Sequence, residues 1–456
     1  MRTLLRSIVY TLIIISASSA ASKALPAEQP ILEKPIPEKP IADSVSGSIS
    51  GFVRDSASGE PIIGASVQVR ELKRGARTNK AGYFILYLPA NNEHLVEVTS
   101  VGYRAFRETI RLRPDEKRTL EVKLSAAAVQ GGEVVVEKDR DREREAPKVS
   151  TVTINPTQVA QLPKAGEADL FRTLQLIPGV KTSSEISSGL YIRGGSPDQN
   201  LILLDGSVLY NPSHFFGFFS TFNSDAIKDV ELIKGGYPAE YGGRLSAVLN
   251  VTNKDGDREQ SHGKFSIGLI SSRATVETPL GTGAVTLSGR RTYLDAIMSA
   301  TGLKEELDLP DYNFYDLNAK ITQNPANGDK LSLSGYLGRD ILDFSDPAAG
   351  ASVLLKWGNR SGSLDWMHLF SEDVFSQFNL SASSYFSELV LGSSGEDFIR
   401  DNDILDYTLN GSLEYSPNEH HQFKFGLQST LYNFKFLVQY GKNPPSANVD
   451  MSPFYG

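Results

Sequence analysis

The stretch Phe378-Asn-Leu-Ser-Ala-Ser-Ser-Tyr-Phe386 decides the fold class of the C-terminal part of the chain. Apolar side chains occupy every second position over its first five residues, a period that predicts a β-strand with one apolar and one polar face. The same alternation recurs at 331–337, 407–415 and 423–427. Segments of about ten residues with this pattern are typical of membrane-spanning antiparallel strands, which we therefore expect over residues 263–456. A soluble β-sandwich is the alternative.

The composition of the chain narrows the range of functions. Its 456 residues include 46 Lys and Arg, 54 Asp and Glu, 6 His and no Cys. The lack of cysteine excludes disulfides, thiol nucleophiles and thiolate zinc sites. A formal net charge of −8 argues against nucleic-acid binding, which needs a basic surface. The chain shows no clustered acid, base or nucleophile, so we expect no enzyme activity, no metal site and no cofactor.

The N-terminus carries the features of an export signal. Arg2 and Arg6 precede the apolar run 8–15, and small residues follow it. This order is typical of a cleaved signal peptide, placed here at residues 1–24, and the run is shorter than the ~20 apolar residues that the alternative, a membrane anchor, would need. A spacer rich in Pro and charge follows at 25–46. With no other apolar segment of that length, the exported protein is either soluble or inserted as a closed β-barrel.

The pattern of residues 47–125 predicts a small β-sandwich. Alternating runs such as 65–70 and 119–124 are separated by turn signals, which gives about seven short strands. His94 and Glu97 have the spacing of a zinc pair, but positions i and i+3 of a strand point to opposite faces, so we reject a peptidase site. The segment resembles the carboxypeptidase-regulatory-like domain in its motifs Gly51-Phe-Val-Arg-Asp, Pro61-Ile-Ile-Gly-Ala, Thr78-Asn-Lys-Ala-Gly-Tyr-Phe and Val101-Gly-Tyr.

Residues 126–146 contain two different segments. Gly131-Gly-Glu-Val-Val-Val136 holds three consecutive β-branched residues, which form an extended strand that adds readily to the edge of another protein's sheet. The alternative is a last strand of the preceding sandwich. The charged run 137–145 alternates in sign and has no apolar residue, so we expect a solvated linker.

Residues 147–255 predict a compact domain that mixes helix and strand. A strand at 201–204, a short helix from Ser224 and a strand at 230–234 follow one another along the chain. Before them, a helix over 167–177 ends at a Pro-Gly pair, and three apolar residues fall on one of its faces: Leu170, Leu174 and Ile177.

The same domain resembles the plug domain of TonB-dependent outer-membrane receptors. The resemblance covers most of residues 145–255 and rests on ordered motifs: Leu176-Ile-Pro-Gly-Val180, Ile192-Arg-Gly-Gly195, Asn200 to Gly206, Val230 to Gly236 and Tyr241-Gly-Gly-Arg-Leu-Ser-Ala-Val248. Several motifs in a fixed order are more specific than a lone Arg-Gly-Gly. Within them we single out Arg193, Gly194, Gly195, Asp205, Gly206, Gly242, Gly243 and Arg244.

The resemblance implies roles for three groups of residues. Arg193 and Arg244 match family arginines that face carboxylates of the barrel wall, with ordinary surface arginines as the alternative. The aromatic stretch 210–219 lies toward the outer face in family plugs, with packing inside the plug as the alternative. The segment that a periplasmic energy-coupling protein binds by strand addition, the TonB box, would be Glu133, Val134, Val135 and Val136. A ligand platform would consist of Tyr210, Asn211, His214 and Phe215.

The number of expected strands is small for a barrel that encloses such a domain. Residues 263–456 hold about nine strands, whereas barrels with a plugged lumen have about 22. Nine open strands would leave two unpaired edges in lipid, where each unsatisfied backbone group costs several kcal/mol. We therefore expect the sequence to be incomplete at its C-terminus, ending in a loop at 441–456. We also expect long acidic connections at 299–312, 340–351 and 390–403.

These observations predict a mainly β protein with an N-terminal β-sandwich, an α+β plug domain and the start of a transmembrane antiparallel β-barrel. The resemblance implies a TonB-dependent receptor in the Gram-negative outer membrane with its N-terminal domain in the periplasm. Such a receptor binds a ligand on the outer face and imports it. Its partners would be a TonB-type energy-coupling protein, outer-membrane lipid and a small ligand such as an iron chelate, cobalamin or glycan. A surface adhesin or signalling receptor of the same architecture, without transport, is the alternative.

Overall fold

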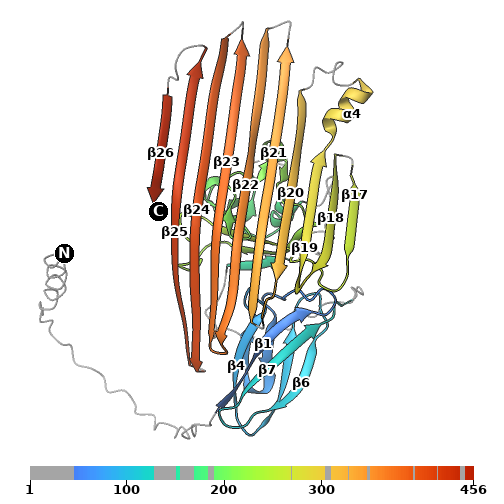
Figure 1. The fold of residues 1–456 in the computed structure, drawn as a ribbon, viewed down its shortest axis with the longest axis vertical. Helices are drawn as coiled ribbons and strands as arrows, with labels where there is room; N and C mark the ends of the chain where they lie inside the picture. The colour runs from blue at the N-terminus through green and yellow to red at the C-terminus, as the bar shows by residue number, and fades with distance from the viewer. Residues whose placement is uncertain are drawn as a thin grey trace, which may run out of the picture. The chain divides into compact units, whose positions relative to one another are not determined.

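The computed structural model describes residues 46–127, 150–154, 169–182, 189–268, 270–302, 310–326, 328–346, 350–393, 396–418, 420–441 and 447–455. The predicted signal peptide, the spacer up to residue 45, the TonB box and the charged linker lie outside the described residues. Figure 1 shows the described strands in chain order, from the N-terminal domain in blue to the last long strands in red.

The N-terminal domain is a β-sandwich, as the sequence predicts. One sheet has the order β4-β1-β7 and the other β3-β2-β5-β6. β1 pairs antiparallel with β4 and parallel with β7. Alternate residues of both sheets, such as Ile49, Val67 and Val122, meet in one buried core. The elements are β1 (Ser46–Asp55), β2 (Ser66–Val69), η1 (Arg70–Leu72), β3 (Arg74–Arg77), β4 (Tyr83–Pro89), β5 (Glu93–Thr99), β6 (Phe106–Arg111) and β7 (Lys117–Leu124).

The two residues with zinc-pair spacing have separate partners in this domain. His94 Nε2 lies 2.9 Å from the carbonyl oxygen of Pro89. Glu97 forms ion pairs with Arg70 at 2.6 Å and Arg107 at 2.7 Å. Both residues belong to β5, but their side chains contact different groups, so the structure does not bring them together.

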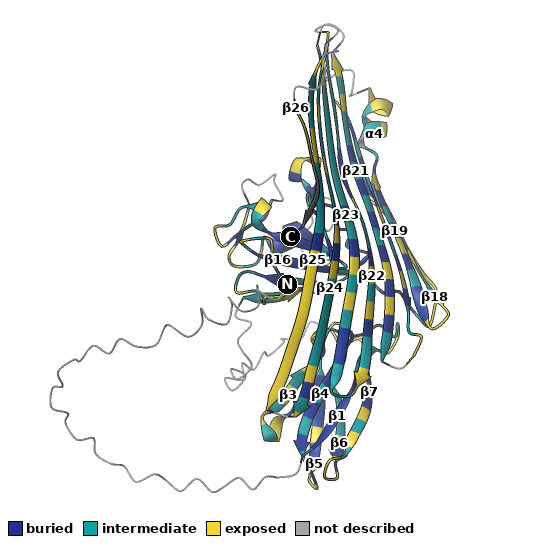
Figure 2. Ribbon diagram, turned by 60° about the vertical axis from the view of Figure 1, so that its left-hand side comes forward, coloured by how far each residue is buried: buried dark blue, intermediate teal, exposed yellow. Residues whose placement is uncertain are grey.

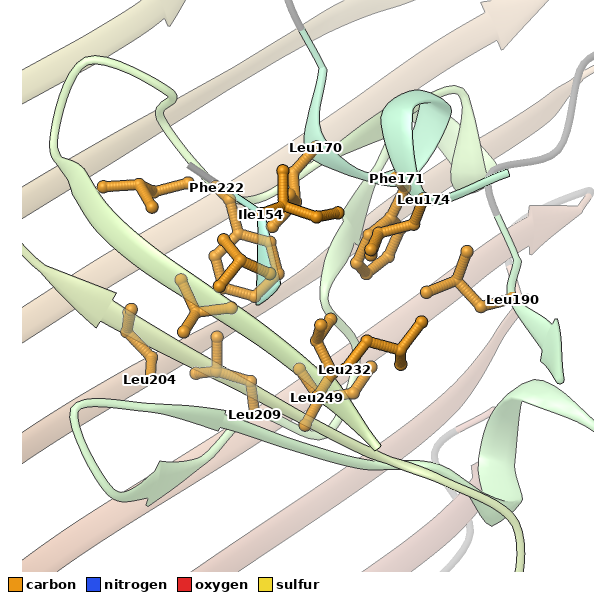
Figure 3. Close-up of a cluster of buried hydrophobic side chains, with 14 of the residues drawn as sticks. Ile154, Leu170, Phe171, Leu174, Leu190, Leu204, Leu209, Phe222, Leu232 and Leu249 are labelled. Carbon is orange, nitrogen blue, oxygen red and sulfur yellow. The ribbon is translucent and has the colours of Figure 1, made fainter. Parts of the chain in front are cut away.

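The central domain is built on a five-stranded sheet with the order β12-β11-β16-β15-β8. Its strands are β8 (Thr151–Ile154), β11 (Leu201–Leu204), β12 (Ser207–Val208), β15 (Ile227–Ile233) and β16 (Val248–Asn253). The helix α3 (Leu170–Leu174) covers this sheet, and Figure 3 shows Leu170, Phe171 and Leu174 pointing toward Leu232 and Leu249. Smaller elements are β9 (Val180–Lys181), β10 (Tyr191–Ile192), η3 (Pro197–Gln199), β13 (Ser213–His214), η4 (Phe215–Gly217) and β14 (Phe219–Ser220).

Two helix predictions in this domain need correction. The helix α3 ends at Leu174, earlier than predicted, because the chain turns there and the N–H of Ile177 donates to the Leu174 carbonyl at 3.0 Å. Ile177 still packs against the core, from the turn rather than from the helix. The short helix from Ser224 is absent, since Asn223 Oδ1 accepts the N–H of Asp225 at 3.1 Å and closes a local turn instead.

The C-terminal region is one antiparallel sheet of ten described strands, in the order of the chain from β17 to β26. Its elements are β17 (His262–Ile267), β18 (Ser271–Leu280), β19 (Gly283–Thr292), α4 (Leu294–Thr301), β20 (Asp311–Gln323), β21 (Asp329–Asp346), β22 (Ala351–Ser371), β23 (Val374–Ser393), β24 (Glu396–Asn418), β25 (His421–Tyr440) and β26 (Ala447–Tyr455).

Burial in this sheet is inverted with respect to a soluble protein. On β20 the charged residues Asp316 and Lys320 are buried, whereas Leu317 and Ile321 between and beyond them are exposed. Predicted apolar positions on other strands, such as Leu333, Leu380 and Leu409, are exposed in the same way, and Figure 2 shows the resulting mixture of colours along the strands. A polar face turned inward and an apolar face turned outward match the start of a transmembrane antiparallel barrel.

The connections of the sheet differ from the sequence prediction. The sheet has ten described strands rather than about nine, and β26 lies within the predicted terminal loop at 441–456, because its residues pair with β25. The acidic stretches at 340–351 and 390–403 are mostly strand, because backbone pairing of β21, β22, β23 and β24 continues through their charged ends. Part of the connection at 299–312 belongs to α4, which ends at Gly302 with a left-handed φ of 71°. None of the described helices is long and apolar enough to cross a membrane.

Candidate functional site

The segment 207–220 of the central domain lies against the sheet and carries the predicted ligand platform. Tyr210 donates its backbone N–H to Asn359 Oδ1 at 3.2 Å, and its hydroxyl donates to Asp406 Oδ2 at 2.6 Å. Asn359 Nδ2 in turn donates to the carbonyl of Asn211 at 2.7 Å. Since Asn359 and Asp406 belong to β22 and β24, these bonds join Tyr210 and Asn211 to two strands of the sheet.

His214 is the most tightly held residue of this segment. Its side chain is 1% exposed and lies between two carboxylates, with Nδ1 2.7 Å from Asp340 and Nε2 2.8 Å from Asp316. Burial alone would lower the pKa of His214, but Asp316 and Asp340 outweigh it and raise the pKa to about 9. The ring is therefore an imidazolium at neutral pH and donates both N–H groups. It is also stacked on Phe314, with centroids 4.1 Å apart.

The carboxylates around His214 have further partners. Asp316 receives an ion pair from Arg290 at 2.6 Å and the hydroxyl of Tyr336 at 2.7 Å. Arg290 also donates to the backbone carbonyl of Ser220 at 2.7 Å. Asp340 accepts a hydrogen bond from the hydroxyl of Tyr312. The same hydroxyl accepts the backbone N–H of Phe215 at 2.7 Å. Both ends of the segment around His214 are thus bound to β19, β20 and β21 through one buried network.

An aromatic group, distinct from the buried imidazolium, faces solvent at this site. Phe215 and Phe216 have left-handed φ angles of 48° and 52°, which non-glycine residues rarely adopt. This backbone leaves Phe216 64% exposed, with its ring centroid 5.3 Å from that of Trp357. Phe215 contacts Tyr312 at 4.6 Å. Tyr312 is the second residue of β20, which follows the α4 connection, so the group lies toward that end of the sheet.

A second buried network joins the central domain to the sheet at Asp205 and Asp255. Lys320 lies 2.9 Å from Asp205 and 3.1 Å from Asp255, and Lys330 lies 2.7 Å from Asp255. Lys228, on β15 of the central domain, completes the set at 2.9 Å. Burial alone would raise the pKa of Asp255, but the three lysines hold it well below its usual range. Asp255 is therefore a charged link between the two parts of the chain.

Two of the predicted motifs contain a glycine at a position where a larger side chain would clash. Asp205 and Gly206 both have positive φ, and a Cβ at Gly206 would meet the Asn379 amide at 2.9 Å, so the turn lies directly on the sheet. A Cβ at Gly195 would meet Ser246 Oγ at 2.2 Å. Gly194, Gly242 and Gly243 have open space beside their Cα atoms.

The two predicted arginines have other contacts in the described residues. Arg193 donates to Ser150 Oγ at 2.9 Å, and Arg244 donates to the carbonyl of Gly243 at 2.8 Å. Neither forms an ion pair with a described carboxylate of the sheet, and their role in holding the plug stays a prediction. The family pattern would place arginines on the plug and carboxylates on the barrel wall. The ion pairs of Asp205, Asp225 and Asp255 are reversed, because the carboxylates lie on the central domain and its connection, and the lysines or arginine lie on the sheet.

Several residues of this site were not singled out in the sequence. Asp316 and Lys320 occupy the polar positions of an alternating strand, and a charge on an inward-facing strand position is a signal that could have identified them. Phe216 lies inside the predicted aromatic stretch, but the platform prediction named His214, which is buried, in its place. In the described part of the chain no group of three His, Asp or Glu residues could hold a metal ion.

The chain is similar to known proteins in sequence and in structure. Residues 49–136 match the model of the CarboxypepD_reg-like domain. Among solved structures, a mutant of the ferric enterobactin receptor of Pseudomonas aeruginosa is 16% identical with a TM-score of 0.47, over 63% of this chain and 49% of that one. The ferric preacinetobactin receptor of Acinetobacter baumannii is 14% identical with a TM-score of 0.44, over 67% and 51%. The chain thus spans about half the length of these structures.

The central domain has its own match. Residues 143–248 match the model of the TonB-dependent receptor plug domain. The matched range begins before β8 and ends at the first residue of β16. This range contains the platform segment, His214, Asp205 and all the predicted plug motifs. The chain therefore joins a segment that matches the CarboxypepD_reg-like domain to a segment that matches the TonB-dependent receptor plug domain, and buried charges bind the second segment to a large antiparallel sheet.

Proposed function

We propose that the protein is a TonB-dependent receptor of the outer membrane that binds a ligand on the outer face and imports it with energy coupled from the inner membrane. The observation that carries the proposal is the contact between the plug and the sheet, which combines buried polar networks at His214 and Asp255 with one aromatic cluster around Phe219. The plug also has an apolar core of its own around α3 and β15. A domain built this way can exchange its outer contacts for water and remain folded.

The energetic argument separates these two kinds of contact. A hydrogen bond to a charged group contributes about 1.5–3 kcal/mol net, because water replaces it when it opens. Exposing the apolar core, in contrast, costs about 25 cal/mol for every Å². A force applied to the plug therefore opens polar contacts, namely those with the sheet and the backbone pairs of β8 at the edge of the plug, before it disrupts the rest of the core. Rearrangement of a folded plug is the step that import requires.

The energy source would act at the proposed TonB box, Glu133 to Val136, which precedes β8. Three β-branched residues next to two glycines suit pairing with the edge of a partner's sheet. A TonB-type protein of the inner membrane would bind there, which places the N-terminal domain in the periplasm. The outer membrane has no ATP supply, so the proposal requires such a partner.

The ligand would meet the exposed rings of Phe215 and Phe216, which supplement the predicted platform, while buried Trp357 supports Phe216 from below. Flat apolar surfaces stack on aromatic rings at centroid distances of about 4.5–7 Å. An iron chelate with aromatic groups, cobalamin and a glycan all offer such a surface. Buried His214 would hold the platform and not touch the ligand.

Growth of a deletion strain on these three nutrient classes tests the proposal. The strain is complemented with the full-length gene or with Val135→Pro, since proline removes a backbone donor and breaks strand addition. Lys138→Gln, three residues further on, is the matched control. We expect the wild type and the control to restore growth on one nutrient, and Val135→Pro to bind that nutrient at the cell surface without restoring growth. Full growth with Val135→Pro, or with residues 133–136 deleted, would contradict energised transport and favour an adhesin or signalling receptor.

A further inference from the structure

The N-terminal domain contacts the segment that connects the plug to the sheet. Arg258, in that segment, donates its N–H to the Ser58 carbonyl at 3.0 Å. Glu60 Oε1 accepts the N–H of Gly256 at 3.1 Å and also that of Asp255. These bonds fix the backbone of residues 255–258 against the loop that follows β1.

A cavity of about 330 Å³ lies beside this contact. Phe52 and Arg54 of β1 and Glu121 of β7 form one wall, and Arg258 and the turn between β20 and β21, including Asn324, form the others. Its volume is enough for several waters or one small polyatomic ion. The walls therefore come from the N-terminal domain, the plug connection and the sheet.

Of the two guanidinium groups of this cavity, that of Arg258 has buried atoms without a hydrogen-bond acceptor among the described residues. The buried Nε and Nη2 atoms of Arg258 have no partner. The Arg54 guanidinium lies over the Phe52 ring at 5.1 Å, a contact that satisfies none of its N–H groups. Buried polar groups are nearly always hydrogen-bonded, so an unpaired guanidinium at a cavity wall indicates a missing acceptor. Burial and the charge of Arg258 lower the pKa of Arg54, against the opposing charges of Glu121 and Asp255.

The other polar groups of the cavity define the kind of anion. Glu121 is a carboxylate, and the buried Asn324 Oδ1 has no donor, because the amide nitrogen of Asn324 is bonded to the Asp329 carbonyl at 3.1 Å. Both groups accept hydrogen bonds, so they disfavour an anion that can only accept. A phosphate group that still carries a proton offers acceptor oxygens to the two arginines and an O–H to Glu121 or Asn324.

We propose that this cavity binds a protonated phosphate group, as inorganic phosphate or a phosphate monoester, between Arg54 and Arg258. The site joins the N-terminal domain to the plug connection, and its existence does not depend on whether the chain imports a ligand. Occupation would add a charged bridge between Arg54 on one part and Arg258 on the other.

Isothermal titration of the full chain in detergent tests the proposal, with inorganic phosphate and sulfate as probes at equal ionic strength. We expect saturable binding of phosphate and at least about tenfold weaker binding of sulfate. Arg258→Gln and Arg54→Gln should each weaken phosphate binding at least about tenfold. Arg118→Gln is the matched control, because Arg118 lies on β7 outside the cavity and pairs with Glu108 at 3.1 Å.

A substitution that strengthens binding serves as a control, because a misfolded variant could only lose binding. Glu121→Gln removes the negative charge, so sulfate should bind several-fold more tightly and the preference for phosphate should shrink. The bound phosphate group could come from a lipid headgroup or from a free phosphate compound. A comparison of short-chain phosphatidic acid, below its micelle concentration, with glycerol 3-phosphate distinguishes these two sources. Tighter binding of the lipid supports a membrane headgroup, and equal binding supports a free phosphate. Absence of saturable phosphate binding, or binding unchanged by both arginine substitutions, would overturn the proposal.

Discussion

Replacing His214 with glutamine tests the role of the buried network between plug and sheet. Glutamine has similar length and can donate to one carboxylate, but it has no charge and cannot bridge Asp316 and Asp340. Asp316 keeps Arg290 as a partner, whereas Asp340 keeps only neutral donors such as Tyr312. The variant therefore leaves a buried carboxylate without its cation.

The size of the effect follows from the pKa of His214. Its rise from an ordinary value of 6.5 to about 9 corresponds to about 3 kcal/mol, at about 1.4 kcal/mol for each pKa unit. Removing one partner of a buried ion pair costs about 3–5 kcal/mol, which agrees. We expect His214→Gln to lower the free energy of opening the plug contact by about 3 kcal/mol.

The pH dependence has a definite sign. Because the folded pKa lies above the unfolded one, the stabilisation by His214 is fully present below about pH 6.5 and is lost as pH rises through about 9. The wild type should therefore lose stability between pH 6.5 and pH 10. The difference between wild type and His214→Gln should be largest at the lower end of this range and shrink toward the upper end.

Trp357 provides the assay, since its ring contacts Phe216 at this site and the chain has only two tryptophans. In a Trp366→Phe background, its fluorescence is followed against urea at several pH values in detergent. His262→Gln is the control, because His262 is 57% exposed and its pair with Asp257 should contribute at most about 1 kcal/mol. A pH-independent difference between wild type and variant, or a loss no larger than in the control, would refute the reasoning.

Three further predictions concern the same region. Asp255→Asn should destabilise the plug contact by about 3–5 kcal/mol, measured by the same fluorescence, because three lysines lose their common anion; a loss below 1 kcal/mol would contradict this. Gly195→Ala should cost about 1–3 kcal/mol in thermal unfolding, because its Cβ overlaps Ser246 Oγ; a Ser246→Gly second variant should restore stability. Phe216→Gly should change stability by no more than about 1 kcal/mol, since glycine accepts the left-handed backbone. It should weaken binding of the imported nutrient about tenfold, and unchanged binding would exclude the aromatic group as a contact.

The sequence predicts the sheet well because its signal is periodic and repeated. Leu380 and Leu409 are exposed where alternation places them on the outer face. The ends of the strands were harder to predict, because pairing along β21 to β24 continues through charged residues that a propensity argument assigns to loops. Local side-chain bonding explains the missing helix at Ser224, since Asn223 competes for the backbone there.

Only part of the site can be predicted from the sequence. The aromatic stretch and the turn at Asp205-Gly206 were identified, because composition and turn chemistry are local properties. The partners Asp316 and Asp340 lie more than a hundred residues from His214, and a single sequence carries no signal that pairs them. For the same reason His214 was assigned to a ligand surface, although the structure places it between two carboxylates.

The position of β8 has a mechanical consequence. β8 is an edge strand of the plug sheet and, among the described residues, pairs with β15 alone, over four residue pairs from Thr151 to Ile154. Tension applied to the chain ahead of Ser150 reaches this strand first. An edge strand detaches one residue pair after another, so each step breaks few bonds at a time and needs a small load. The remaining four strands keep their order, and the detached strand can pair again when the pull ends.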